Sequence, residues 1–202
     1  MIQKLPVQYE LTLMPPAMMG REYVKTFGHR HIAEPRSGID YTEVCRVEYG
    51  TAHFLLHDLD LDRDAPSSGV AYLIEAKAGD TILLPPGYDH LTINPGPGPM
   101  LFSDVIARGV YGIYDRFRVT RGACLLEVES GGSPTFIPNP TYSNVPSLQR
   151  IPMCEYPKLQ LGRDIPLYQA LCETKGDIWE FLLDPTLFWP CFPDLKAAMG
   201  IQ

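Results

Sequence analysis

The feature that most restricts the fold is a succession of short β-prone segments between residues 8 and 128. Each segment is rich in β-branched and aromatic side chains, and clusters of glycine, proline and aspartate separate it from the next. No helical period is sustained in this region. Many short strands joined by such turns predict an all-β barrel or sandwich. The expected strands cover residues 8–13, 22–27, 43–49, 52–56, 70–76, 81–84, 91–94, 100–106, 111–119 and 123–128.

The last third of the chain has a different character. Residues 138–163 are proline-rich and irregular, which predicts an extended strap over the domain. Short helices are expected over residues 165–173, 178–183 and 194–199, the first two capped by Asp164 and Asp177.

The aromatic residues of this tail constrain where it lies. Trp179, Phe181, Phe188, Trp189 and Phe192 would form a large exposed apolar surface if the tail were free. We therefore expect a β-barrel domain over residues 1–142. Residues 143–202 would form a strap and short helices packed on the barrel or on a partner subunit.

The composition narrows the partners of the chain. The net charge is −7 and no basic stripe is present, so nucleic acid is not an expected partner. No apolar run approaches the ~18 residues of a membrane span, and the N-terminus lacks a signal-peptide pattern. The five cysteines are scattered without a C-x-x-C motif, which argues against disulfides and thiolate zinc sites. The expected compartment is a reducing cytoplasm.

Two histidines lie close together in the sequence Gly28-His29-Arg30-His31. Side chains of a strand alternate between its faces, so His29 and His31 point the same way and can bind one metal ion together. The same pattern is typical of ordinary polar residues on a solvated strand. The pair therefore needs support from another part of the chain.

A third histidine follows a turn rich in glycine and proline, in the sequence GDTILLPPGYDHLTIN of residues 79–94. Pro85 and Gly87 would turn the chain sharply between two strands and bring His90 back towards the barrel interior. A hairpin with an incidental histidine would explain the turn. It would not explain the spacing of these residues together with the upstream histidine pair.

These two segments resemble the two sequence motifs of the cupin superfamily. Gly79, Pro85, Gly87, His90 and Asn94 fit the second motif at every position. The resemblance implies an all-β cupin fold, which is a double-stranded β-helix or jelly-roll barrel, here with a short C-terminal helical extension.

The first cupin motif implies a carboxylate ligand after the two histidines, and two glutamates compete for that role. Glu34 lies close to His31, but Tyr41 stands seven residues after it, where the family has a glycine. Glu43 is followed by Gly50 at the family spacing, although the loop before it is longer than usual. The expected metal ligands are therefore His29, His31, Glu43 and His90.

Three neutral imidazoles and one carboxylate suit one divalent ion, which could be Mn, Fe, Ni, Zn or Co. The donor types do not choose among these metals. A six-coordinate ion would leave two positions open for water or substrate, which is typical of catalytic or ligand-binding sites.

Residues 20–142 resemble more narrowly the cupin-type, or archaeal-type, glucose-6-phosphate isomerases. Matching blocks occur in order at residues 21–31, 83–94, 111–113 and 139–140. The resemblance implies a metal-dependent sugar-phosphate aldose–ketose isomerase that interconverts glucose 6-phosphate and fructose 6-phosphate. It also implies a homodimer, because cupin barrels often pair and the apolar tail needs a surface to cover it.

The resemblance assigns further roles to individual residues. Glu43 would be both ligand and catalytic base, and Tyr111 would be the second catalytic residue. Thr26, Gly28 and Tyr88 would bind the substrate. The chain departs from the family at Cys45, Gly87 and Gly109, so the metal, the particular sugar phosphate and the choice between hydride shift and enediol stay open.

Two other functions remain open at this stage. One is a different metal-dependent cupin enzyme, such as an Fe(II) dioxygenase, which would have an apolar pocket. The other is a non-catalytic sugar-binding cupin that keeps its metal.

Other polar residues are interpreted as structural. His53 and His57 are expected to be surface or rim residues. The aspartates of residues 58–64 are expected at a solvated hairpin tip, since an EF-hand's glycine and closing glutamate are lacking. Arg108, Arg116 and Arg118 are expected to be surface charges.

Overall fold

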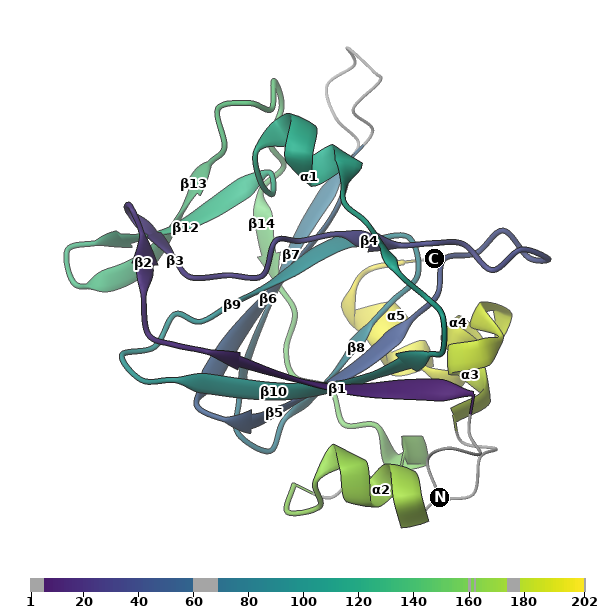
Figure 1. The fold of residues 1–202 in the computed structure, drawn as a ribbon. Helices are drawn as coiled ribbons and strands as arrows, with labels where there is room; N and C mark the ends of the chain where they lie inside the picture. Colours follow the sequence, from purple (N-terminus) through teal and green to yellow (C-terminus); the bar gives the residue numbers. More distant parts are fainter. Residues whose placement is uncertain (1–5, 60–68, 160, 162, 174–178, 202) are drawn as a thin grey trace.

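Two four-stranded sheets form the centre of the structure (Figure 1). The computed structural model describes residues 6–59, 69–159, 161, 163–173 and 179–201. One sheet has the strand order β1-β10-β5-β8 and the other has the order β14-β7-β6-β9. The first consists of β1 (Val7–Met14), β10 (Met100–Ala107), β5 (Glu43–Tyr49) and β8 (Thr81–Leu84). The second consists of β14 (Leu148–Arg150), β7 (Val70–Lys77), β6 (Thr51–Asp58) and β9 (Asp89–Ile93).

The chain passes back and forth between these sheets. After β5 in the first sheet come β6 and β7 in the second, and β8, β9 and β10 then alternate between the two. Residues 25–31 lie along the free side of β9 through the backbone pairs Lys25–Ile93 and His29–His90. This winding is a double-stranded β-helix, or jelly roll, so the predicted fold class is confirmed.

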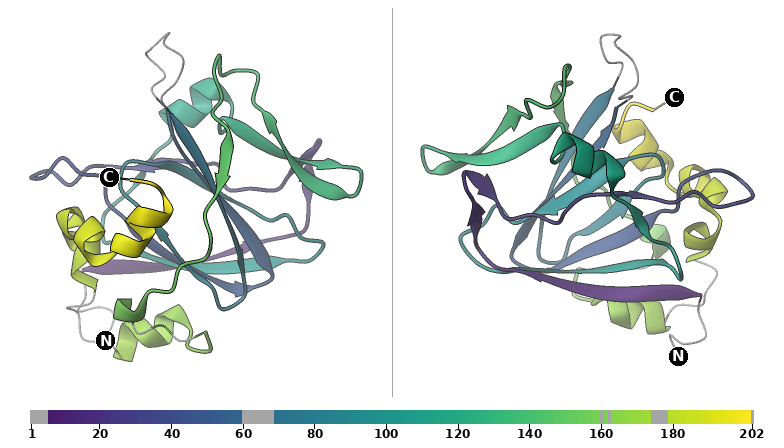
Figure 2. Two further views of the ribbon diagram at one scale, coloured as in Figure 1. Left: turned by 180° about the vertical axis from the view of Figure 1, so that it is seen from behind. Right: turned by 45° about the horizontal axis from the view of Figure 1, so that its top comes forward.

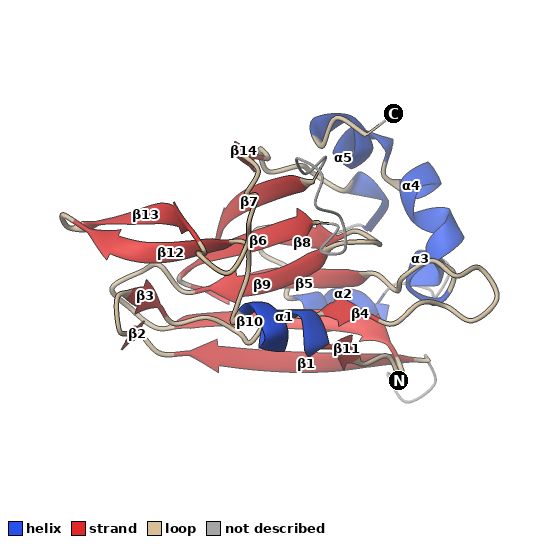
Figure 3. Cartoon of the chain, turned by 90° about the horizontal axis from the view of Figure 1, so that it is seen from above, coloured by secondary structure: helices blue, strands red, loops and turns tan. Residues whose placement is uncertain are grey.

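A smaller sheet projects from the barrel, with the order β13-β12-β3-β2. Its strands are β2 (Met18–Met19), β3 (Glu22–Tyr23), β12 (Leu125–Ser130) and β13 (Ser133–Pro138). Figures 1 and 3 show the β12–β13 hairpin at the end of the molecule away from the C-terminal helices. A final pair, β4 (Arg30–His31) and β11 (Gly112–Ile113), joins the histidine pair to the segment after β10.

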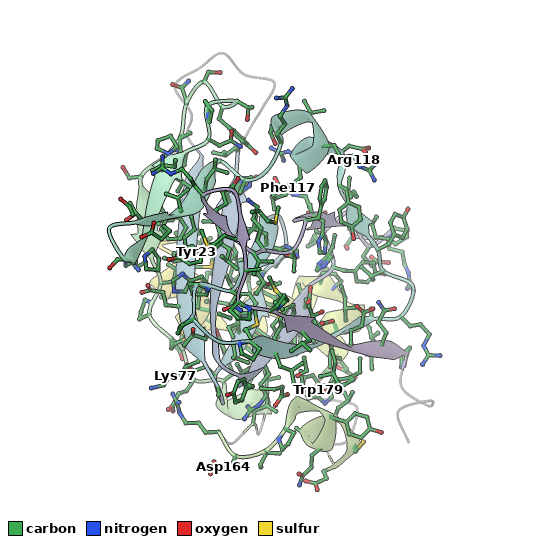
Figure 4. The ribbon with its side chains drawn as sticks, turned by 60° about the vertical axis from the view of Figure 1, so that its left-hand side comes forward. Tyr23, Lys77, Phe117, Arg118, Asp164 and Trp179 are labelled. Carbon is green, nitrogen blue, oxygen red and sulfur yellow. The ribbon has the colours of Figure 1, made fainter. Side chains whose placement is uncertain are left out.

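The prediction of a strand over residues 111–119 is wrong. Only β11 is extended there, and Asp115–Thr120 form the helix α1. Phe117 and Thr120, three residues apart, share its buried side, which a helix permits and a strand does not. Figure 4 shows Phe117 on the inner side of the helix and Arg118 towards solvent. Burial of Phe117 thus overrides the β-propensity of the surrounding residues.

The C-terminal extension is helical, as predicted. It contains α2 (Leu167–Glu173), α3 (Glu180–Leu183), α4 (Phe188–Cys191) and α5 (Pro193–Ala198), with 3₁₀ turns at Pro157–Leu159 and Pro185–Leu187. Asp164 lies in a turn, and α2 begins at Leu167 rather than at residue 165. Asp177 and the start of the second expected helix lie outside the described residues. The strap is less irregular than expected, because β14 within it pairs in parallel with β7.

The extension packs on the outer face of the first sheet, and Figure 2 shows its helices gathered on one side of the barrel. Val44 and Val105 pair across β5 and β10 and point away from the barrel interior, yet both are fully buried. They belong to one apolar cluster with Phe181 and Phe188. Trp179 is buried as well, whereas Trp189 is half-buried. The tail therefore completes a second core outside the barrel.

Two further expectations concern membrane-spanning segments and disulfide bonds. Across the described residues, no helix has the length and apolar character needed to cross a membrane. All five cysteines are free thiols, in agreement with their scattered spacing. Cys45 and Cys124 are buried, and burial raises the pKa of the Cys124 thiol to about 12, so this thiol stays protonated at neutral pH.

Candidate metal centre

Four side chains from separate segments converge inside the barrel. His29 precedes β4, His31 ends it, Glu43 begins β5 and His90 lies in β9. One donor atom from each lies within 4.8 Å of the others. The Nε2 atoms of His29 and His31 are 3.3 Å apart, and Oε2 of Glu43 lies 3.1 Å from His31 Nε2 and 3.9 Å from His90 Nε2.

Backbone carbonyls orient two of the imidazoles. The Nδ1 of His31 lies 3.0 Å from the carbonyl oxygen of Tyr41, and the Nδ1 of His90 lies 3.2 Å from that of Tyr88. A carbonyl oxygen can only accept, so each Nδ1 carries the hydrogen and donates it. With the hydrogen on Nδ1, the Nε2 atoms are the ones that can present lone pairs towards the centre of the cluster.

The charges of the cluster suit metal binding. Burial, followed by the nearby charge of His31, lowers the pKa of His29 to about 4. Burial also lowers the pKa of His90 well below its ordinary value. Burial by itself would raise the pKa of Glu43, but the hydrogen bond and charge of His31 and the charge of His90 bring it down to about 2. His29 and His90 are therefore neutral and Glu43 is ionised at neutral pH, which are the metal-binding forms.

This donor set fits a divalent metal ion. Nε2 of His90 is buried and has no hydrogen-bond partner in the described part of the chain. Buried polar atoms are rarely left in this state unless a water or ion satisfies them. A cation at the centre would engage the three ring nitrogens and the carboxylate together, in a set that Mn, Fe, Ni, Zn and Co all accept.

A pocket of about 360 Å³ opens over the four side chains. Its walls come from both sheets and from the segment after β10, and the lining combines polar and apolar side chains. No lysine or arginine is present among the described lining residues. Besides the four candidate ligands, these are Gln8, Glu10, Thr12, Thr26, Phe27, Leu84, Thr92, Phe102, Asp104, Ile106, Val110, Tyr111, Gly112 and Tyr114.

Besides Glu43, the structure places two of the predicted substrate and catalytic residues in this pocket. Thr26 lines it, and its Oγ1 accepts a hydrogen bond of 3.0 Å from the Thr92 backbone N–H. The hydroxyl hydrogen of Thr26 is therefore available to a ligand. Tyr111 also lines the pocket, but its side chain is largely exposed, which places it at the rim.

The other predicted residues lie outside the pocket lining. Gly28 is buried under the ring of Phe117, where an added Cβ would come within 2.4 Å of a ring carbon. The ring of Tyr88 lies 5.9 Å from that of Tyr72. Glu34 lies apart from the cluster, in a turn where its carboxylate accepts the backbone N–H groups of Arg36 and Ser37.

Several residues of the site carry no signal in the sequence. Asp104 and Glu10 both line the pocket and are directly opposite each other on β10 and β1. Gly112 leaves room for the ring of His29, which would lie 2.6 Å from an added Cβ. Only the alternation of side chains along β10 could have indicated that Asp104 points inward. That inference also requires knowing which strands pair with β10.

Ion pairs behind the cluster join the strands that carry the histidines. Arg30 lies between His29 and His31 in the sequence, and its Nε is 3.6 Å from the fully buried carboxylate of Asp89, next to His90. Arg116 Nη1 is 3.1 Å from the same carboxylate. Arg116 therefore has a buried partner and is not simply the surface charge that was expected. The Arg30–Asp89 pair links the two histidine-bearing segments, and the Arg116–Asp89 pair links α1 to β9.

The expectation for His57 is wrong, because its side chain is fully buried. It lies against Phe117 and Tyr142, and neither ring nitrogen has a hydrogen-bond partner among the described residues. Burial, with the charges of Arg116 and Arg30, lowers its pKa from 6.5 to about 3. His53 is half-buried instead, and its Nδ1 lies 2.6 Å from Glu127 on β12. The aspartate-rich hairpin tip lies largely outside the described residues.

The buried His57 predicts that the protein is sensitive to acid. The folded-state pKa of about 3 lies below the ordinary 6.5, so the unfolded state binds more protons between these values. This contribution to stability is present above pH 6.5 and is lost as the pH falls towards 3. His57→Leu should therefore reduce the slope of unfolding free energy against pH in this window by up to about 1.4 kcal/mol per pH unit. Urea titrations of both metal-free proteins at several pH values would measure this, and parallel curves would contradict it.

Comparison with known proteins gives one family. Residues 1–138 match the family described as glucose-6-phosphate isomerase (GPI). The glucose-6-phosphate isomerase of Thermococcus onnurineus is 24% identical over 136 residues, which cover 67% of this chain and 65% of that protein. That of Thermococcus litoralis is 31% identical over 96 residues, covering 48% and 44% respectively. The chain thus spans less than two thirds of the length of these curated relatives.

Solved structures with a similar arrangement include two bacterial proteins. The alignment with the oxalate decarboxylase of Lactobacillus farciminis covers 59% of this chain and 31% of that protein's chain, at 15% identity and a TM-score of 0.40. A Cupin 2 conserved barrel domain protein of Salinispora arenicola aligns with 56% of this chain and 71% of its own, at 20% identity and a TM-score of 0.33.

The winding of the strands and the histidine-glutamate cluster define a class of protein, the cupin barrels with an internal site able to hold a metal. Within that class, the matched family model identifies a single family. The chain belongs to the glucose-6-phosphate isomerase family, as its sequence motifs indicated.

Proposed function

We propose that the chain is a metal-dependent aldose–ketose isomerase that interconverts glucose 6-phosphate and fructose 6-phosphate. One observation carries this proposal: the donor atoms of His29, His31, Glu43 and His90 converge beneath an open pocket in a chain of the glucose-6-phosphate isomerase family. A homodimer in the cytoplasm remains the prediction for its assembly and location.

The polar groups in the pocket lining favour a sugar over an apolar substrate. Thr12, Thr26, Thr92, Glu10 and Asp104 offer hydroxyl and carboxyl groups. Such groups can donate to and accept from the hydroxyls of a sugar. The dioxygenase alternative, for which an apolar pocket was expected, therefore has less support.

Each proposed residue has a distinct task. The three histidines and Glu43 would hold the metal ion, which when bound supplies a Lewis acid that polarises the carbonyl of the sugar. Thr26 would donate its hydroxyl hydrogen to the phosphate end, and Tyr111 would close the pocket at its rim. Gly28 has a supporting task, since it allows α1 to pack beside the site. Tyr88, packed on Tyr72, takes no part in this proposal.

A reconstitution assay tests the proposal. The full chain is stripped of metal with a chelator and reloaded separately with Mn(II), Fe(II) or Zn(II). The stripped protein should not convert fructose 6-phosphate, and at least one metal should restore turnover in a coupled assay. Loaded protein that turns over no sugar phosphate with any of these metals would contradict the proposal.

Unphosphorylated fructose is the matched control for the substrate. Because the described lining residues include no lysine or arginine, the phosphate would rely on hydroxyl and backbone donors and on the charge of the ion. Fructose 6-phosphate should nevertheless be the better substrate by kcat/KM. Equal or faster conversion of free fructose would retain the isomerase chemistry and reject the phosphate assignment.

A further inference from the structure

One carboxyl group in the pocket has no structural task. Asp104 lies near the middle of β10, lines the pocket and is only 6% exposed. Its side chain makes no hydrogen bond or ion pair with any other described residue. Its carboxyl oxygens face the open space of the pocket, where water or a bound molecule can contact them. Its orientation into the pocket indicates that a bound molecule provides the missing partner.

The strand register places Asp104 at a useful distance from the metal centre. Ile106 pairs with Glu43, and Asp104 is the next inward-facing residue along β10. Two residues of a strand span about 7 Å, so the two carboxyl groups belong to neighbouring rows of the same inner face. A sugar held at the metal centre would reach Asp104 without displacing a ligand.

Glu43 is less suited to move a proton, although the family resemblance makes it a candidate base. Its Oε1 lies 3.2 Å from the Cys45 thiol, which donates to it, and its Oε2 lies 3.1 Å from His31 Nε2. A metal ion would occupy its remaining lone pairs. The Asp104 carboxyl group makes no such contacts with the described residues.

The surroundings of Asp104 increase the affinity of its carboxylate for a proton. Glu10 lies opposite it on β1 and Cys45 lies opposite it on β5, with Glu43 one row away. Burial is the largest cause that raises the pKa of Asp104 above its ordinary value, and the charge of Glu10 acts in the same direction. A carboxylate with a raised pKa is a stronger base.

We propose that Asp104 is the catalytic residue that carries the hydrogen between C2 and C1 of the sugar, an inference that rests on the proposed isomerase function. The Asp104 carboxylate takes the proton from C2, and the electrons of that C–H bond form the C1=C2 bond of an enediol while O1 gains a proton. Asp104 then gives its proton to C1, and O2 releases a proton as it becomes the carbonyl. One C–H bond breaks and one forms, and no oxidant or reductant is needed.

Three variants of the full chain test this proposal. Asp104→Asn keeps the shape but cannot carry the proton, Asp104→Glu keeps the carboxyl, and Ser103→Ala perturbs the same strand on its other face, where Ser103 bonds Glu48. For each, metal content is measured by mass spectrometry and binding of sorbitol 6-phosphate by calorimetry. Turnover of fructose 6-phosphate is followed in D₂O, with deuterium in the product located by NMR.

The expected pattern separates proton transfer from a structural role. Asp104→Asn should keep metal content and sorbitol 6-phosphate affinity within about 3-fold, while kcat falls by about 10²- to 10⁴-fold. Asp104→Glu should recover part of that loss, Ser103→Ala should match the wild type, and wild-type product should contain carbon-bound deuterium.

Several outcomes would overturn the assignment. Undiminished kcat in Asp104→Asn would exclude Asp104 as the proton carrier and leave the isomerase function standing. Loss of metal or of sorbitol 6-phosphate binding in Asp104→Asn would make it a structural residue instead. If the metal-loaded wild type converts no sugar phosphate, the proposed function falls and this inference falls with it.

Discussion

Glu43→Ala is expected to lower metal affinity by more than about 100-fold, whereas Glu34→Ala should leave it unchanged. Loss of a residue that merely supports a ligand already costs 10- to 100-fold, and loss of the charged ligand itself should cost more. A carboxylate oxygen of Glu43 lies within 4.8 Å of a ring nitrogen of each of the three histidines, and its pKa of about 2 keeps it ionised under all mild conditions. Glu34 instead accepts two backbone N–H groups in a separate turn.

Metal content after dialysis, measured by mass spectrometry, decides between the two carboxylates. Glu34→Ala is the matched control, since it removes the same kind of side chain from a turn outside the cluster. Equal metal content in the wild type and in Glu43→Ala would show that this carboxylate is no ligand. Circular dichroism spectra of both variants would establish that neither has lost its fold.

Removal of residues 143–202 is expected to abolish most of the stability of the barrel. Full burial of each large apolar side chain contributes roughly 2–3 kcal/mol, and Trp179, Phe181 and Phe188 are all buried. Together they represent a large share of the ~5–15 kcal/mol that stabilises a typical domain. The deletion also uncovers Val44 and Val105 and removes β14 from the edge of β7. The truncated chain should melt far below the full chain and aggregate, which light scattering and thermal denaturation would detect.

Point variants keep this prediction testable if the truncated chain does not fold. Phe181→Ala should cost about 3–5 kcal/mol, because it empties a buried site between the sheet and the helices. Leu183→Ala, in the same helix but exposed, should cost less than about 1 kcal/mol. A truncated chain as stable as the full one, or equal effects of the two substitutions, would show that the tail is an independent appendage.

The candidate metal centre was largely accessible to sequence reasoning because its signals are local. Alternation along a strand puts His29 and His31 on one face, and a proline-glycine turn returns His90 to the barrel. The choice of Glu43 over Glu34 came from the resemblance to the cupin motif. The four side chains that converge in the structure are those that the sequence singled out.

Errors arose where burial by distant residues outweighs local preference. Residues 115–120 have the composition of a strand, yet packing of Phe117 against residues such as Gly28 and His57 makes them helical. His57 itself resembles a surface histidine in sequence, because nothing near it in the chain indicates that α1 and Tyr142 cover it.

The sequence by itself indicated an all-β barrel or sandwich and three candidate histidine ligands, because strand length, turn residues and alternation are properties of short segments. The resemblance to the cupin motifs added the jelly-roll class and Glu43. Only the tertiary structure decided what surrounds that donor set. Asp104 becomes a buried, unpartnered carboxyl because β10 lies between β1 and β5, strands more than 50 residues distant in the chain. The tail becomes part of the core because it covers the far side of the same strands. Pairings over such sequence distances depend on the free energy of the whole packed domain, which no local pattern encodes.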